Sequence, residues 1–190
     1  MKVRDSGMPD ADYWDSLFDV SLALDRLELN SACRDIVEFG CGYGTFTLPA
    51  ARRISGTCYA LDIDEAAIMI AEESVRKSNL KNIIFARRDF IEQGTGLLDA
   101  TMDYAMVFNI LHHERPVEIL REAYRVLAPG GTVGVIHWVY SDKTPRGPTM
   151  DIRPKPENLY DNLIEAGFIV KIGWPIDCPP WHYGLIGIKR

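Results

Sequence analysis

The sequence predicts a doubly wound α/β fold with one mostly parallel, seven-stranded sheet. Short apolar segments alternate with amphipathic helical patterns along nearly the whole chain, as the crossover connections of parallel strands require. The last two apolar segments follow each other without a helix between them, which predicts one antiparallel strand near the C-terminus. A chain of 190 residues with 47% hydrophobic residues can build one core, so we expect residues 1–190 to form a single domain.

The first half of the chain is expected to contain three of the strands. Residues 12–29 place apolar side chains close to helical spacing, which predicts one or two helices within an N-terminal segment, 1–34. Asp64 is an expected N-cap, because its carboxylate can accept hydrogen bonds from the free amides of a first helical turn. Strands are expected at 35–39, 56–63 and 82–89, and helices at 45–54 and 65–80.

The second half continues the alternation up to its last two strands. Pro116 begins a helical pattern that a Pro-Gly-Gly sequence ends before residue 132. The glycine-rich stretch 92–101 is expected to be an irregular connection. Gly167 is the expected C-terminal cap of the last helix. Strands are expected at 103–110, 132–140, 168–174 and 182–190, and the last helix at 156–168.

Composition excludes several classes of protein. No stretch approaches the roughly 18 apolar residues of a membrane helix, and the N-terminus lacks the apolar region of a secretory signal. A net charge of −6 disfavours a nucleic-acid partner. The four cysteines lack metal-ligand spacing, so we expect reduced thiols and no metal site. These features predict a cytoplasmic protein without a membrane or nucleic-acid partner.

The stretch "IVEFGCGYGTFT" (36–47) places Gly40, Gly42 and Gly44 directly after the first expected strand. Such a turn lets the backbone approach a ligand at the carboxyl end of the sheet, where α/β proteins bind their ligands. The alternative is a tight turn without a ligand. Acidic residues at the ends of the first three strands favour the ligand, and they are Glu38, Asp62 and Asp89. Asp62 has the position of an acid that accepts the hydroxyls of a ribose.

The series "IVEFGCGYGTFT", "YALDIDEAAI", "ARRDF", "FNILHH" and "RVLAPGGTVGVIHW" resembles the motifs of class I S-adenosylmethionine-dependent methyltransferases. It is most similar to the branch that acts on small molecules, which includes the quinone-biosynthesis methyltransferases. The resemblance covers about 35–140. A dinucleotide dehydrogenase expects G-x-G-x-x-G, but Thr45 stands where its third glycine is required. The spacing therefore favours the methyltransferase.

The resemblance implies roles for individual residues toward S-adenosylmethionine. Glu38 would lie near the methionine amino group, and the three glycines would pass beneath the amino-acid and ribose parts. Asp62 would hold the ribose hydroxyls, and Asn109 would offer its carbonyl to the methionine amine. The residues that would contact the adenine are Ile63, Asp89 and Phe90. For Ile63 and Phe90, core packing is the alternative.

The N-terminal segment would form a lid in this family. Tyr13, or else Trp14, would cover the sulfonium with its π face, since an aromatic face attracts a cation. The alternative is that both residues simply anchor the first helix to the core.

The expected reaction is direct in-line transfer of the methyl group to a small-molecule acceptor, with S-adenosylhomocysteine as the product. His112 and His113 are candidate catalytic bases, because they follow the fourth strand, and His137 lies near the end of the fifth. The alternative for "HHERP" is a helix start with solvent-facing histidines. A second hypothesis is a catalytically silent protein that binds the cofactor as a partner or sensor.

The stretch 140–155 is long for a connection and is a candidate substrate loop. Its basic residues would favour an anionic acceptor, or they are solvated surface charges; they are Lys143, Arg146, Arg153 and Lys155. The sequence "NILH" (109–112) differs from the Asn/Asp-Pro-Pro-aromatic element of enzymes that methylate amide or base nitrogens, so these substrates are disfavoured.

Overall fold

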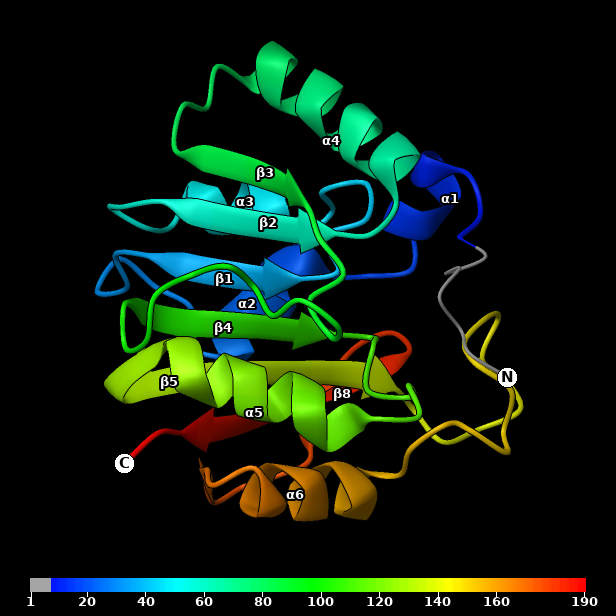
Figure 1. The fold of residues 1–190 in the computed structure, drawn as a ribbon. Helices are drawn as coiled ribbons and strands as arrows, with labels where there is room; N and C mark the ends of the chain where they lie inside the picture. The colour runs from blue at the N-terminus through cyan, green and yellow to red at the C-terminus, as the bar shows by residue number, and fades with distance from the viewer. Residues whose placement is uncertain (1–7) are drawn as a thin grey trace.

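The fold is an α/β sheet with helices on both faces in the computed structural model, which describes residues 8–190. The described residues form eight strands in the order β3-β2-β1-β4-β5-β8-β6, and β7 pairs with β8 outside this path (Figure 1). The strands are β1 (Ile36–Phe39), β2 (Cys58–Asp62), β3 (Ile83–Arg87), β4 (Met102–Phe108), β5 (Leu127–Trp138), β6 (Ile169–Val170), β7 (Ile176–Cys178) and β8 (His182–Ile188).

The direction of the strands confirms the predicted fold class. Strands β1 to β5 pair in parallel, whereas β8 runs antiparallel to β5. The predicted seven strands are all present, and β7 is an additional short strand in the proline-rich link before β8. No helix of the described part of the chain is long and apolar enough to cross a membrane.

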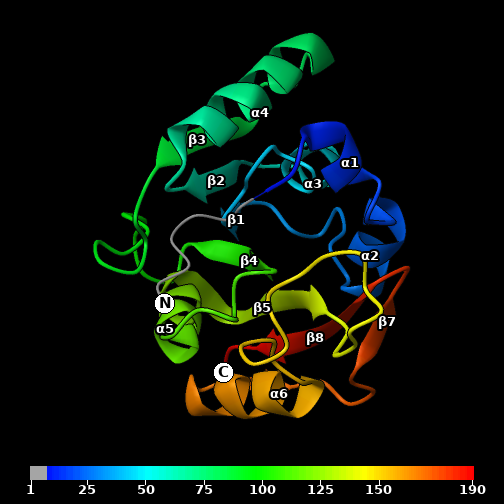
Figure 2. The same ribbon diagram turned by 90° about the vertical axis from the view of Figure 1, so that its right-hand side faces the viewer.

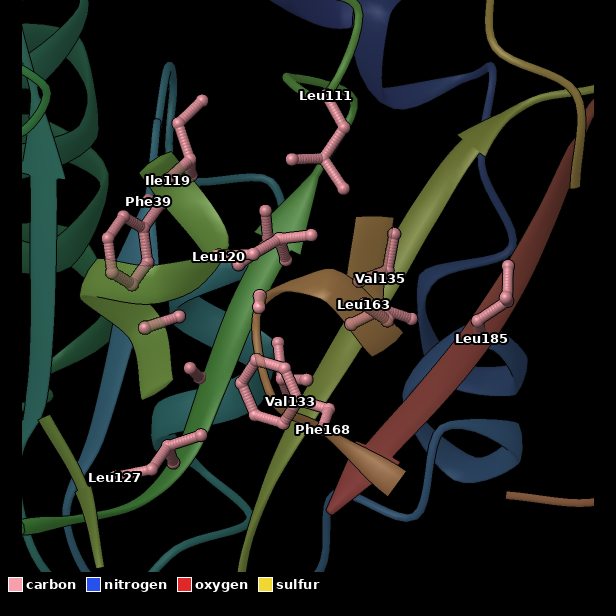
Figure 3. Close-up of a cluster of buried hydrophobic side chains, with 14 of the residues drawn as sticks. Phe39, Leu111, Ile119, Leu120, Leu127, Val133, Val135, Leu163, Phe168 and Leu185 are labelled. Atoms are coloured by element: carbon pink, nitrogen blue, oxygen red, sulfur yellow. The ribbon is translucent and has the colours of Figure 1, made fainter. Parts of the chain in front are cut away.

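Helices cover the two faces of the sheet separately. Buried residues of α2 and α3 pack on one face, and buried residues of α5 and α6 pack on the other (Figure 2). Figure 3 shows the second of these cores, with Leu120 of α5 and Leu163 of α6 against Val133 and Val135 of the central strand β5. The helices are α1 (Ala11–Asp15), α2 (Val20–Arg26), α3 (Thr47–Ala51), α4 (Glu65–Ser78), α5 (Pro116–Val126) and α6 (Pro156–Glu165).

Local sequence signals explain several boundaries. The carboxylate of Asp64 accepts hydrogen bonds from the amides of Ala66 and Ala67, which confirms it as the N-cap of α4. Pro116 begins α5 as predicted, and the stretch 92–101 contains no helix or strand. Strand β5, however, begins at Leu127 rather than at residue 132. The Pro-Gly-Gly sequence therefore lies inside the strand, where the pairing of β5 with β4 shifts register.

The carboxyl ends of β1 to β5 meet at one edge of the sheet, which faces the viewer in Figure 2. The glycine turn after β1, the connection 109–115 after β4 and the long loop 139–155 after β5 all leave the sheet there. Because parallel strands bring distant loops to one edge, this edge is where a ligand site is expected.

Candidate functional site

The glycine turn has a backbone that other residues adopt only with strain. Gly40, Gly42 and Gly44 all have positive φ angles, of 78°, 50° and 84°. The amides of Gly40 and Cys41 donate to the carbonyl of Leu61 at 2.8 and 3.0 Å, which ties the turn to the end of β2. The three glycines therefore hold the turn close to the sheet edge.

Asp62 is fixed against this turn. One carboxylate oxygen accepts a hydrogen bond from the Gly42 amide at 2.7 Å, and the other accepts from the Asp64 amide at 2.9 Å. Burial raises the pKa of Asp62, and the hydrogen bonds from the backbone partly oppose this effect. Ile63 follows directly, so both residues predicted from the sequence lie beside the glycine turn.

Glu38 carries a buried carboxyl group, and its described hydrogen-bond partner is a neutral hydroxyl group. Glu38 is only 2% exposed, and the Thr47 hydroxyl donates a hydrogen bond to its carboxyl oxygen at 2.5 Å. Burial raises the pKa of Glu38 to about 8, and the nearby Asp62 adds to the shift. A cationic group beside Glu38 would oppose this shift, because it would stabilise the ionised carboxylate.

Asn109 presents an acceptor without a partner at the same place. It has a φ angle of 58°, which is uncommon for a residue with a side chain. Its amide donates to the Ile136 carbonyl at 2.8 Å, whereas its side-chain oxygen is buried without a hydrogen-bond partner. A small cavity of about 40 Å³ joins Asn109 to Glu38, and it is lined by Met8, Trp14, Glu38, Gly40, Cys41, Gly42, Thr45, Phe46, Phe108 and Asn109.

Two residues of the N-terminal segment, Met8 and Trp14, line this cavity. The Met8 side chain lies so close to the backbone of Gly42 that a Cβ there would be 3.0 Å from the methyl carbon of Met8. The Tyr43 hydroxyl donates to the Pro9 carbonyl at 2.9 Å. Trp14 lines the cavity, whereas Tyr13 is 41% exposed and is not among the lining residues. The cavity holds little more than a water molecule, so a larger ligand needs some of the lining side chains to move.

Asp89 and Phe90 lie at the end of β3, outside the lining of this cavity. The Asp89 carboxylate accepts hydrogen bonds from two following amides, each at 3.2 Å, so it caps its own turn. Phe90 packs edge-on against the buried Phe39, with ring centroids 5.2 Å apart. The predicted contact of both residues with an adenine stays a prediction.

The two predicted catalytic histidines have different surroundings. Nδ1 of His113 accepts a hydrogen bond from the Arg115 amide at 3.0 Å, in the turn before α5. Nδ1 of His112 lies 3.3 Å from Nε2 of His137, which is fully buried in β5. Burial lowers the pKa of His112 to about 4, with His113 and Arg153 adding to the shift. The structure thus pairs His112 with His137, a contact that the sequence could not reveal because 25 residues separate the two.

The loop 139–155 is held by Arg153. Arg153 is 8% exposed, and its guanidinium donates hydrogen bonds to the backbone carbonyls of Val139, Ser141 and Pro148. Arg153 therefore stabilises the loop, and a role of its charge toward an acceptor stays a prediction. Lys155 lies over the ring of Tyr140, 4.8 Å from its centroid.

Glu38 and Asn109 fit a cofactor with an ammonium group. Two buried acceptors without a cation face one cavity beside a glycine turn, and a donor with positive charge would satisfy both. Among the described residues, no group of three or more His, Cys, Asp or Glu side chains could hold a metal ion.

Comparison with known proteins identifies a family for the chain. A family described as "Methyltransferase domain" matches residues 36–131, about half of the chain. The chain is 27% identical over 175 residues to a sterol 24-C-methyltransferase of Eremothecium gossypii, over 80% of this chain and 46% of that protein. It is 28% identical over 174 residues to a probable S-adenosylmethionine-dependent methyltransferase of Mycolicibacterium smegmatis, over 87% and 63%. The chain thus spans about half the length of the curated relatives it matches.

The fold also has a solved counterpart. The crystal structure of a SAM-dependent methyltransferase from Aquifex aeolicus aligns with a TM-score of 0.82 and 23% sequence identity, and the alignment covers 95% of this chain and 94% of that one. This likeness concerns the fold, while the family match concerns the sequence that carries the glycine turn and β1 to β4. The chain belongs to the family described as the methyltransferase domain.

Proposed function

We propose that this chain binds S-adenosylmethionine and transfers its methyl group to a small-molecule acceptor. The observation that carries the proposal is the pair of buried acceptors, Glu38 and the side-chain oxygen of Asn109, against the glycine turn. When bound, the cofactor supplies a methyl group on a positively charged sulfur. The chain itself then has to bind the cofactor and the acceptor, orient them toward each other and exclude water. Bringing the two reactants together in this way favours the transfer.

In the proposed arrangement, the parts of the cofactor lie along the carboxyl edge of the sheet. Glu38 would ionise and pair with the methionine ammonium, and Asp62 would accept the ribose hydroxyls next to the Gly42 amide. Ile63, Asp89 and Phe90 would contact the adenine. Trp14 is better placed than Tyr13 to cover the sulfonium, because Trp14 lines the cavity.

The acceptor is proposed to be a small molecule. The sterol methyltransferase among the relatives is named for such a substrate. The loop 139–155 leaves β5 at the ligand edge and is proposed to lie against the acceptor, with Arg153 as its internal support. His112 is the proposed base, since the Nδ1 of His113 is engaged within its own turn.

Calorimetric titration with S-adenosylmethionine, S-adenosylhomocysteine and NAD tests the proposal. We expect binding of both sulfur compounds and none of NAD. Asp62→Ala should weaken the binding by about tenfold, since it removes a charge-assisted contact with the ribose. A preference for NAD, or an unchanged affinity in the variant, would contradict the assignment of the cofactor.

A further inference from the structure

The sheet has two edges, and they are protected to different extents. One edge is divided between two short strands, β6 with two residues and β7 with three, which pair with different parts of β8. Lys171 follows β6, and its ammonium group pairs with Glu28. Short edge strands and charged side chains are usual ways in which proteins keep another chain from pairing with a sheet. This edge therefore has protection built into it.

The other edge is β3, which is longer and mostly apolar. It has five residues, reads Ile-Ile-Phe-Ala-Arg, and pairs with β2 without a bulge. Each of its residues is at least partly exposed, Ile84 to 50%, whereas all four residues of β1 are buried. On the face of the sheet that carries α5 and α6, no helix of the described residues lies over β2 and β3 (Figure 1). Such a strand is a template for pairing with another chain.

The backbone hydrogen bonds show which groups of β3 point away from the sheet. The Cys58 amide donates to the Asn82 carbonyl at 2.8 Å, and the Arg88 amide donates to the Asp62 carbonyl at 2.6 Å. In a parallel pair, every second residue of a strand bonds to a given neighbour, so the even-numbered residues face β2. The amides and carbonyls of the odd-numbered residues therefore point outward, and these residues are Ile83, Phe85 and Arg87.

A second copy of this chain fits these groups in one antiparallel register. When Phe85 lies opposite Phe85 of the other copy, Ile83 lies opposite Arg87, and all three outward residues exchange backbone hydrogen bonds. A shift of two residues in either direction pairs only two of the three with each other. The symmetric register therefore uses the whole edge, and a two-fold axis through Phe85 relates the two copies.

The side chains also match in this register. Ile84 lies opposite Ala86 of the second copy, on the face that no helix of the described residues covers, so pairing removes exposed apolar surface from water. Just beyond the strand ends, Lys81 lies opposite Asp89, which carries the opposite charge. Arg87 lies opposite an isoleucine, so no two like charges face each other across the pair.

We propose that two copies of this chain associate through β3, whose antiparallel pairing joins their sheets into one. Each copy contributes the same five residues, 83–87, so the interface is self-complementary and closes after two copies. The association needs no cofactor, so it can fail without the proposed function failing.

Sedimentation equilibrium of the full chain without cofactor tests the proposal. A single strand pair is a small interface, so we expect a dimer with a Kd on the order of 10 µM. Ile84→Lys should raise this Kd at least about tenfold, because it places a charge beside the paired strand. The fold should tolerate the change, since half of this side chain is exposed. Ile169→Lys is the matched control, 44% exposed in β6 at the opposite edge, and should keep the Kd.

Disulfide cross-linking tests the register with two further variants. Ile84 and Ala86 of the two copies would form a pair without backbone hydrogen bonds, with Cα atoms about 4.5 Å apart, within the range of a disulfide. A mildly oxidised mixture of Ile84→Cys and Ala86→Cys should therefore give a covalent dimer with one copy of each. Either variant alone should not exceed the wild type, which carries four cysteines of its own.

Three results would overturn the proposal. A wild-type chain that stays monomeric well above the expected Kd would leave β3 to a strand of another protein. A dimer that Ile169→Lys dissociates and Ile84→Lys does not would place the interface at the opposite edge. A covalent dimer of Ile84→Cys alone would mean that the strands pair in another register.

Discussion

The proposed cofactor side and the proposed acceptor side of the sheet edge are built in different ways. The cofactor side, formed by Glu38, the glycine turn 40–44 and Asp62, uses backbone amides and carboxylates that follow β1 and β2 directly. The acceptor side, formed by His112, His137 and the loop 139–155, uses side chains that meet only after β4 and β5 have paired. The cofactor side therefore depends on local backbone geometry, and the acceptor side on long-range packing.

The largest expected effect is on the cofactor side. Glu38→Ala should weaken the binding of S-adenosylmethionine by about 10²-fold or more, because the ammonium would be buried without its counter-charge. Calorimetry measures the affinity, and His112→Gln serves as a control that should bind the cofactor as tightly as the wild type. If Glu38→Ala binds S-adenosylmethionine within twofold of the wild-type affinity, the assignment of Glu38 to the cofactor side is contradicted.

On the proposed acceptor side, His112→Gln should lower the turnover of a small-molecule acceptor by about 10²-fold, since a positioned general base contributes about this much. The Kd of S-adenosylhomocysteine should stay within about twofold, because His112 is proposed to touch only the acceptor. Single-turnover kinetics under cofactor saturation measure the chemical step. Equal losses of turnover and of cofactor affinity would contradict the division.

Glu38 also predicts how stability without cofactor depends on pH. The carboxyl keeps its proton in the folded protein up to about pH 8, whereas in the unfolded chain it ionises near its ordinary value of 4.5. Between these values the folded state holds a proton that the unfolded chain has released, so the free energy of unfolding falls as the pH rises. We expect a loss of roughly 3 to 4 kcal/mol between pH 5 and pH 8 in urea denaturation.

Glu38→Gln is the matched control for this pH effect, because it is neutral at every pH and similar in shape. Its free energy of unfolding should vary less between the same two pH values. Saturation with S-adenosylmethionine should also reduce the loss in the wild type, since an ammonium beside Glu38 favours the ionised form. The same pH dependence in the wild type and in the variant would mean that other groups cause it.

The smallest effect concerns the two aromatic residues of the N-terminal segment. Trp14→Phe should weaken cofactor binding by about threefold, since it removes ring surface from the cavity lining, whereas Tyr13→Phe should leave the affinity unchanged. Tryptophan fluorescence on adding S-adenosylhomocysteine offers a second reading, with Trp14→Phe expected to lose part of the signal. A larger effect from Tyr13 would support the original lid prediction.

The sequence alone determined the parallel α/β fold, the N-cap at Asp64 and the position of the glycine turn. These features depend on local causes, namely hydrophobic periodicity, capping chemistry and the backbone freedom of glycine, and each of them lies within a few neighbouring residues. The start of β5 at Leu127 was missed because its pairing with β4 outweighed the turn signal of Pro-Gly-Gly.

Only the tertiary structure decided the acceptor side. It joined His112 to His137, buried Arg153 among the carbonyls of its own loop, and laid Met8 over Gly42. Each of these contacts depends on where separate strands and loops come to lie after folding, and no periodicity in the chain records that placement. The sequence therefore indicated the residues proposed for the cofactor side, while the packing of the strands brought together those proposed for the acceptor side.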